Sequence, residues 1–198
     1  ERRVFAGLGV SLAAGGALLL TGPNGSGKSS LLRLMAGLGR PAGGAIFWND
    51  LDIAEDAETH NARLHYVGHG DALKPALTAL ENVAFWAAVR GDDDVPARAR
   101  TGLAAFGAEK LRDVPGRFLS AGQRRRVNLA RLAATAAPLW ILDEPATALD
   151  RDSVARLQDA IARHRAGGGL VALSTHGGID IPDATVLDLA PFTESAAA

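Results

Sequence analysis

The sequence predicts an α/β fold with a mostly parallel sheet, and three observations support this prediction. Short apolar runs without polar alternation are typical of strands buried on both faces, and they occur at residues 17–20, 45–48, 64–67, 139–142, 170–173 and 186–189. Helical patterns lie between several of these runs, at residues 28–36, 81–90, 96–106, 121–136 and 152–165. A glycine-rich loop joins the first run to the first helical pattern. Strands that alternate with helices indicate a layered α/β fold.

Length and composition limit the classes of function. A chain of 198 residues favours one domain, and its formal net charge of -1 gives no general attraction to polyanions, so we expect no nucleic-acid partner. The absence of cysteine excludes disulfides and thiol catalysis. No apolar stretch approaches the roughly 20 residues that a membrane-spanning helix needs. The sequence starts without methionine, so we expect its numbering to begin inside a longer natural chain.

The loop "GPNGSGKSS" predicts a phosphate-binding site between a strand and a helix. Its glycines allow successive backbone N–H groups to point into one concavity, where the helix amino terminus also favours an anion. Lys28 would reach the outer phosphates, and the Ser29 hydroxyl would bind Mg²⁺. The alternative is a glycine-rich turn without a ligand. The candidate phosphate contacts are Gly22, Pro23, Asn24, Gly25, Ser26, Gly27, Lys28, Ser29 and Ser30.

Two adjacent carboxylates follow the apolar run at residues 139–142. The carboxyl ends of parallel strands meet at one edge of a sheet, so Asp143 and Glu144 should lie near the phosphate loop. We expect Asp143 to hold Mg²⁺ and Glu144 to polarise a water molecule for attack on a γ-phosphate. The alternative is a strand that ends in an ordinary acidic turn.

The segment "LSAGQRRRV" predicts a second anion site. Ser120 is a suitable N-cap for the helix that follows, and the small residues Ala121 and Gly122, before Gln123, leave the helix amino terminus accessible. The alternative is an ordinary capped helix whose arginines, at 124–126, form a solvated face.

The order of these motifs resembles that of the ATP-binding cassette ATPases. "GPNGSGKS", "LSAGQ", "LDEP", "ALD" and a strand ending in "STH" occur in the family's order over nearly the whole chain. The resemblance implies a P-loop NTPase fold that hydrolyses ATP with Mg²⁺ as a homodimer. Each ATP would lie between the phosphate loop of one copy and Ser120 to Gln123 of the other. Residues 148–150 would communicate across the dimer, and His176 would contact the γ-phosphate.

The resemblance also divides the chain. Residues 1–198 would form a single ATP-binding domain, with a catalytic core at 1–72 and 119–198. Residues 73–118 contain two helical patterns, the acidic "GDDD" and no convincing strand, so we expect a helical subdomain inserted into the core.

His69 occupies a position where most of the family has a glutamine that contacts Mg²⁺ and the attacking water. Because imidazole is a poor direct ligand for Mg²⁺, we expect a contact through water, and the alternative is a tolerated polar substitute. A histidine here, together with "LTALENV" and "LARL", resembles the ATP-binding subunits of the haem exporters of cytochrome c maturation. This branch implies a peripheral protein on the cytoplasmic face of the bacterial inner membrane, bound to polytopic, haem-handling permease subunits.

The sequence leaves several alternatives open. The chain could serve another transporter, act as a soluble cassette ATPase on ribosomes or nucleic acid, or sense nucleotides without catalysis, although Asp143 and Glu144 together argue against a sensor. The family usually stacks adenine on an aromatic residue upstream of the phosphate loop. This sequence offers only Phe5, which comes late, so that residue would precede Glu1 or the contact would be weak.

Overall fold

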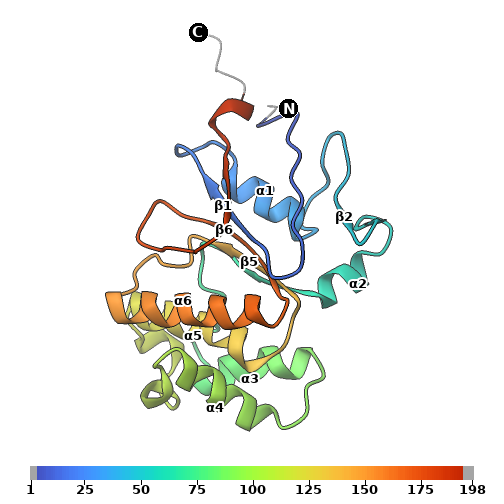
Figure 1. Cartoon of the computed structure of the whole chain (residues 1–198). Coiled ribbons are helices and arrows are strands. Elements are labelled where there is room, and N and C mark those ends of the chain that lie inside the picture. Colours follow the sequence, from blue (N-terminus) through green and yellow to red (C-terminus); the bar gives the residue numbers. More distant parts are fainter. Residues whose placement is uncertain (1–3, 194–198) are drawn as a thin grey trace.

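A five-stranded parallel sheet forms the centre of the structure, a computed structural model that describes residues 4–193 (Figure 1). The spatial order is β4-β5-β6-β1-β7, and every neighbouring pair is parallel. The strands are β1 (Ala17–Thr21), β4 (Leu64–Val67), β5 (Leu139–Asp143), β6 (Leu170–Ser174) and β7 (Thr185–Asp188). The predicted α/β fold with a parallel sheet is therefore confirmed, and five of the six predicted strands lie in this sheet.

Alternate residues of each strand point to opposite faces of the sheet, and helices cover both faces. In β5, Leu139 and Ile141 belong to the core around α1 (Lys28–Met35), whereas Trp140 and Leu142 belong to the core on the other face. That second core contains residues of α3 (Ala79–Val89), α4 (Val95–Ala105), α5 (Ala121–Ala134) and α6 (Arg151–Ala166). The apolar strand residues are thus removed from water on both faces.

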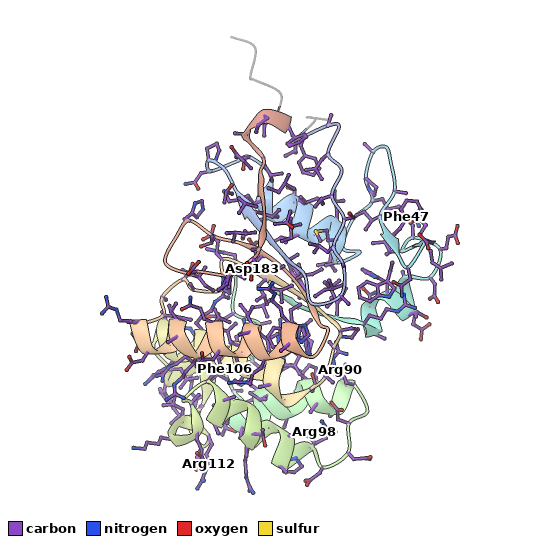
Figure 2. The ribbon with its side chains drawn as sticks, in the orientation of Figure 1. Phe47, Arg90, Arg98, Phe106, Arg112 and Asp183 are labelled. Atoms are coloured by element: carbon purple, nitrogen blue, oxygen red, sulfur yellow. The ribbon has the colours of Figure 1, made fainter. Side chains whose placement is uncertain are left out.

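The segment expected to form a helical subdomain contains α3, α4 and two short 3₁₀ helices, η1 (Glu109–Leu111) and η2 (Gly116–Phe118). A capping box starts α3, in which the Thr78 hydroxyl accepts from the Glu81 N–H and the Glu81 carboxylate accepts from the Thr78 N–H. Both helices pack against α5, and the ring of Phe106, at the end of α4, is buried (Figure 2). The division of the chain at residues 73 and 118 stays a prediction.

The predicted strand at residues 45–48 differs from the structure. Only Phe47–Trp48 is extended, as β2, and it pairs antiparallel with β3 (Leu51–Asp52) outside the main sheet. Asn49 and Asp50 have positive φ angles of 49° and 66°, which a two-residue hairpin turn requires. Phe47 lies on this hairpin at the periphery (Figure 2), and it is 63% exposed. The apolar run suggested a buried strand, but the turn after it forms a local, exposed hairpin.

A short helix, α2 (Ala57–Ala62), was not predicted because it carries little apolar periodicity. Asp56 caps it by accepting a hydrogen bond from the Thr59 N–H at 3.0 Å. The remaining 3₁₀ helix, η3 (Ala190–Phe192), follows β7. Within residues 4–193, no helix is both long enough and apolar enough to span a bilayer.

Candidate active site

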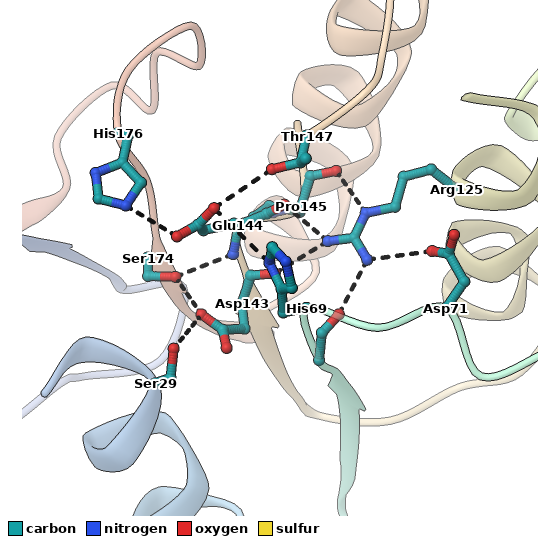
Figure 3. Close-up of polar contacts among 11 residues, drawn as sticks. Ser29, His69, Asp71, Arg125, Asp143, Glu144, Pro145, Thr147, Ser174 and His176 are labelled. Carbon is teal, nitrogen blue, oxygen red and sulfur yellow. Dashed lines mark hydrogen bonds and ion pairs between the residues drawn. The ribbon is translucent and has the colours of Figure 1, made fainter. Parts of the chain in front are cut away.

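Four loops meet where neighbouring strands of the sheet reach their carboxyl ends (Figure 3). The phosphate loop follows β1, the segment with His69 follows β4, Glu144 follows β5, and His176 follows β6. Loops at this edge of a parallel sheet are the usual position of nucleotide sites in α/β folds. The fold therefore collects residues that lie more than 140 positions apart in the sequence.

The phosphate loop surrounds its own lysine. Lys28 is buried, and its Nζ group donates to the carbonyl oxygens of Gly22 at 2.8 Å and Pro23 at 3.0 Å. Gly27 has a φ of 95°, and a side chain there would collide with Val4 and Phe5. A pocket of about 300 Å³ next to this loop is lined by residues that include Asn24, Gly25, Gly27, Lys28, Ser29, Ser30, Glu144 and His176.

Asp143 lies on the same face of β5 as Leu139 and Ile141, so its carboxylate points toward α1. Its Oδ1 atom accepts a hydrogen bond from the Ser29 hydroxyl at 3.1 Å and another from the Ser174 hydroxyl at 2.7 Å. The structure thus brings together Ser29 and Asp143, the two predicted Mg²⁺ ligands. Their role as ligands stays a prediction.

Glu144 adopts an unusual backbone conformation, with a φ of 47°. A non-glycine residue in the left-handed region is strained and needs support from its surroundings. The Glu144 N–H donates to the Ser174 Oγ atom at 3.0 Å, so one hydroxyl holds both carboxylate residues. The Glu144 side chain points toward His176, whose Nε2 atom lies 2.9 Å from Oε1. Glu144 and His176, two of the residues predicted to act in catalysis, are therefore in direct contact.

His69 lies on the other side of the same carboxylate. Its Nδ1 atom is 3.9 Å from the Glu144 Oε2 atom, and its side chain is 70% exposed. This distance is too long for a direct hydrogen bond. The position is consistent with an indirect role, and the predicted contribution to catalysis stays a prediction.

The segment from Ser120 to Gln123 starts α5 with the predicted N-cap. The Ser120 hydroxyl accepts from the Gln123 N–H, and the Gln123 side chain accepts from the Ser120 N–H at 2.8 Å. Gly122 lies so close to the Ala148 carbonyl oxygen that a Cβ atom would approach it to 2.7 Å. Of the described residues that line the pocket at the phosphate loop, none belongs to 120–123.

Two important polar residues were not recognised from the sequence. Ser174 is fully buried and supports both carboxylate residues. The one sequence feature that could have indicated its role is its position two residues before His176. The arginines at 124–126 were expected to form a solvated face if this helix had no ligand, but Arg125 is 3% exposed and hydrogen-bonds the loops after β4 and β5. No sequence signal distinguishes Arg125 from its two neighbours.

Phe5 has a packing role in the structure. Its ring lies against Gly27, and it contacts the core on the α1 face of the sheet. Val4 rather than Phe5 lines the pocket at the phosphate loop. These contacts do not support Phe5 as the residue that stacks on adenine.

Comparisons with known proteins agree with this fold and site. The family model described as "ABC transporter" matches residues 5–147. A solved structure of an ATP-binding cassette, described as a dimer in a post-hydrolysis state bound to ADP and Pi, superposes with a TM-score of 0.78. The two sequences are 27% identical, and the match covers 88% of this chain and 80% of that one.

Two curated relatives are more similar in sequence. The cytochrome c biogenesis ATP-binding export protein CcmA of Rhodospirillum rubrum is 59% identical, over 97% of this chain and 82% of its own length. The protein of the same name from Paramagnetospirillum magneticum is 55% identical, over 96% of this chain and 89% of its own length. The chain therefore belongs to the ABC transporter family of ATP-binding proteins and, within it, to the family of the cytochrome c biogenesis ATP-binding export proteins.

Proposed function

We propose that this chain hydrolyses ATP at the pocket described above, as the ATP-binding subunit of a transporter that exports haem for cytochrome c biogenesis. One observation carries the ATPase part: Lys28, Glu144 and His176 line the same pocket. Lys28 and the loop amides bind phosphates, Glu144 polarises the attacking water, and His176 orients the Glu144 carboxylate and contacts the γ-phosphate.

The donor set at the phosphate loop fits Mg²⁺. Ser29 and Asp143 supply a hydroxyl and a carboxylate oxygen, which are the hard ligands that Mg²⁺ prefers. When bound, Mg²⁺ would neutralise charge on the β- and γ-phosphates.

A second copy would complete the site. The motif at Ser120 to Gln123 has the form of an anion site, yet it does not line the pocket of its own chain. In a head-to-tail homodimer it would cover the ATP held by the partner's phosphate loop. The relative with a solved structure is described as dimeric, which supports this arrangement.

The membrane subunit would dock on α3. Phe85 and Val89 lie four residues apart on this helix and are 39% and 64% exposed, so they form one apolar face. The Asn82 side chain accepts from the Lys74 N–H and donates to the Lys74 carbonyl oxygen, which fixes the loop after β4 to the same helix. Docking on α3 would therefore act on the loop that contains His69. The names of the curated relatives support export in cytochrome c biogenesis, and haem is the cargo that we infer.

Affinity purification of the tagged chain from detergent-solubilised membranes tests this proposal. Mass spectrometry should identify a polytopic permease that binds haem, and Val89→Glu should abolish its capture. Val186→Glu is a matched control, because Val186 is 61% exposed on the edge strand β7. A permease for another substrate would refute haem export, and ribosomal RNA in place of a permease would refute transport.

A further inference from the structure

The Arg125 guanidinium holds the backbone that carries the two carboxylate residues (Figure 3). Its Nη2 group donates to the carbonyl oxygens of Asp143 at 3.0 Å and Glu144 at 2.7 Å, and Nε donates to the Pro145 carbonyl oxygen at 3.1 Å. These bonds fix the strained peptide at Glu144 from the side opposite Ser174. The direction of the Glu144 side chain thus depends on Arg125.

The same guanidinium also holds the loop that contains His69. Its Nη1 group donates to the Gly68 carbonyl oxygen at 2.9 Å and to the Asp71 Oδ1 atom at 3.5 Å. These two residues flank His69 and Gly70. One rigid, planar group therefore fixes the loop after β4 relative to the loop after β5.

The geometry requires arginine at this position. A guanidinium has five N–H donors in a planar fork, and Arg125 uses them in five contacts to five different residues. Lysine has three donors at a single point and could not reach both segments. Burial lowers the pKa of Arg125 and the charge of Asp71 raises it, so Asp71 offsets part of the cost of burying the cation.

We propose that Arg125 and Asp71 form a positioning pair through which the loop at residues 68–71 sets the orientation of Glu144 for hydrolysis. This inference deepens the proposed function and rests on Glu144 being the residue that activates water. Neither member of the pair touches the substrate.

The pair can act as a link because the Asp71 contact is the longest of the five that Arg125 makes, whereas the Gly68 carbonyl oxygen, at 2.9 Å, is held as closely as residues 143–145. The bonds from Arg125 to residues 143–145 are 2.7 to 3.1 Å long, whereas the contact with Asp71 is 3.5 Å and the Asp71 side chain is 21% exposed. The Asp71 contact breaks first when the loop moves. Because the loop is fixed to α3, docking of a membrane subunit would reach Glu144 through Asp71 and Arg125.

Steady-state ATPase measurements on the full chain with Mg²⁺ and ATP test the pair. Asp71→Asn keeps an oxygen acceptor but removes the charge, and it should lower kcat about tenfold while KM for ATP stays within about twofold. Arg125→Lys should lower kcat further. The double variant should be no slower than Arg125→Lys alone, because both changes break one link. Arg126→Lys is the matched control, since the one hydrogen bond that Arg126 makes among the described residues goes to the Gly107 carbonyl oxygen and lysine keeps its charge, and its kcat should equal that of the wild type.

An unchanged kcat in Asp71→Asn would overturn the pair, and so would additive effects in the double variant or a rise in KM that matches the fall in kcat. If Arg125→Lys does not fold, the result for Asp71→Asn alone tests the pair, because the Asp71 side chain is partly exposed and its substitution should leave the fold intact. Glu144→Gln separates the two proposals. If Glu144→Gln loses turnover while Asp71→Asn keeps it, the positioning role of Arg125 and Asp71 is refuted and the proposed function stands. If Glu144→Gln keeps turnover, both the positioning role and the proposed function are refuted.

Discussion

The Oε1 atom of Glu144 lies 2.9 Å from the Nε2 atom of His176, so the residue after β5 and the residue after β6 are in direct contact. Loss of the imidazole would leave the carboxylate free to rotate away from the pocket. We therefore expect His176→Ala to lower kcat about 100-fold, the scale of a positioned acid or base group. His176→Gln, which keeps an N–H donor, should recover part of the loss. An alanine variant with wild-type turnover in a phosphate-release assay would contradict this role.

Ser174 should control the dependence of activity on Mg²⁺. Its buried hydroxyl donates to the Asp143 carboxylate and accepts from the Glu144 N–H, so Ser174→Ala removes the shorter of the two hydroxyl contacts to Asp143 and leaves a buried N–H group unpaired. We expect the Mg²⁺ concentration at half-maximal ATPase activity to rise about tenfold, with a loss of unfolding free energy of about 1 to 3 kcal/mol. Ser174→Thr keeps the hydroxyl and should preserve the Mg²⁺ dependence. An unchanged Mg²⁺ titration of the alanine variant would show that Ser174 does not position Asp143.

His69→Gln tests whether the histidine has a special role. Glutamine keeps a polar group of similar reach but lacks the imidazole ring that lies 3.9 Å from the Glu144 carboxylate. We expect the variant to hydrolyse ATP but to respond less to the membrane subunit. If its ATPase rate responds to the membrane subunit as the wild type does, the histidine is only a tolerated substitute for glutamine.

His65 predicts a pH dependence of stability that is separate from catalysis. Burial, and secondly the charge of Arg90, lower the pKa of His65 to about 3, and its Nε2 atom lies 2.7 Å from the Thr135 hydroxyl. The unfolded chain binds a proton at His65 below about pH 6.5, whereas the folded chain does not until about pH 3. Stability is therefore full above pH 6.5 and falls as the pH decreases between these values.

At pH 5 this single group should cost about 2 kcal/mol of unfolding free energy relative to pH 8. Urea unfolding at the two pH values measures the difference, and His65→Gln should reduce it by that amount. An equal pH effect in the wild type and His65→Gln would contradict the assignment.

Local patterns in the sequence predicted most of the fold. Apolar runs at residues 64–67 and 139–142 correspond to β4 and β5, and the phosphate loop lies between β1 and α1 as its motif requires. The run at 45–48 was misassigned because the same letters suit a buried strand and an exposed hairpin. The turn at Asn49 and Asp50 decided between them.

The sequence predicted only those site residues that lie in recognisable motifs. Lys28, Asp143 and Glu144 stand out because their chemistry appears in a short, recognisable context. Arg125 does not, since its burial and its five contacts require α5 to pack against the ends of β4 and β5 at the same time. Three adjacent arginines look alike in a sequence, and only their placement on the helix separates them.

The most direct test of the account is the behaviour of Glu144→Gln with ATP. The variant keeps the shape of the side chain but cannot polarise water, so it should bind ATP and stop before hydrolysis. Light scattering after gel filtration should then detect a dimer that retains ATP, whereas Lys28→Ala, which removes the predicted phosphate contact, should stay monomeric under the same conditions. Turnover by Glu144→Gln at the wild-type rate, with no ATP-bound dimer, would contradict the account.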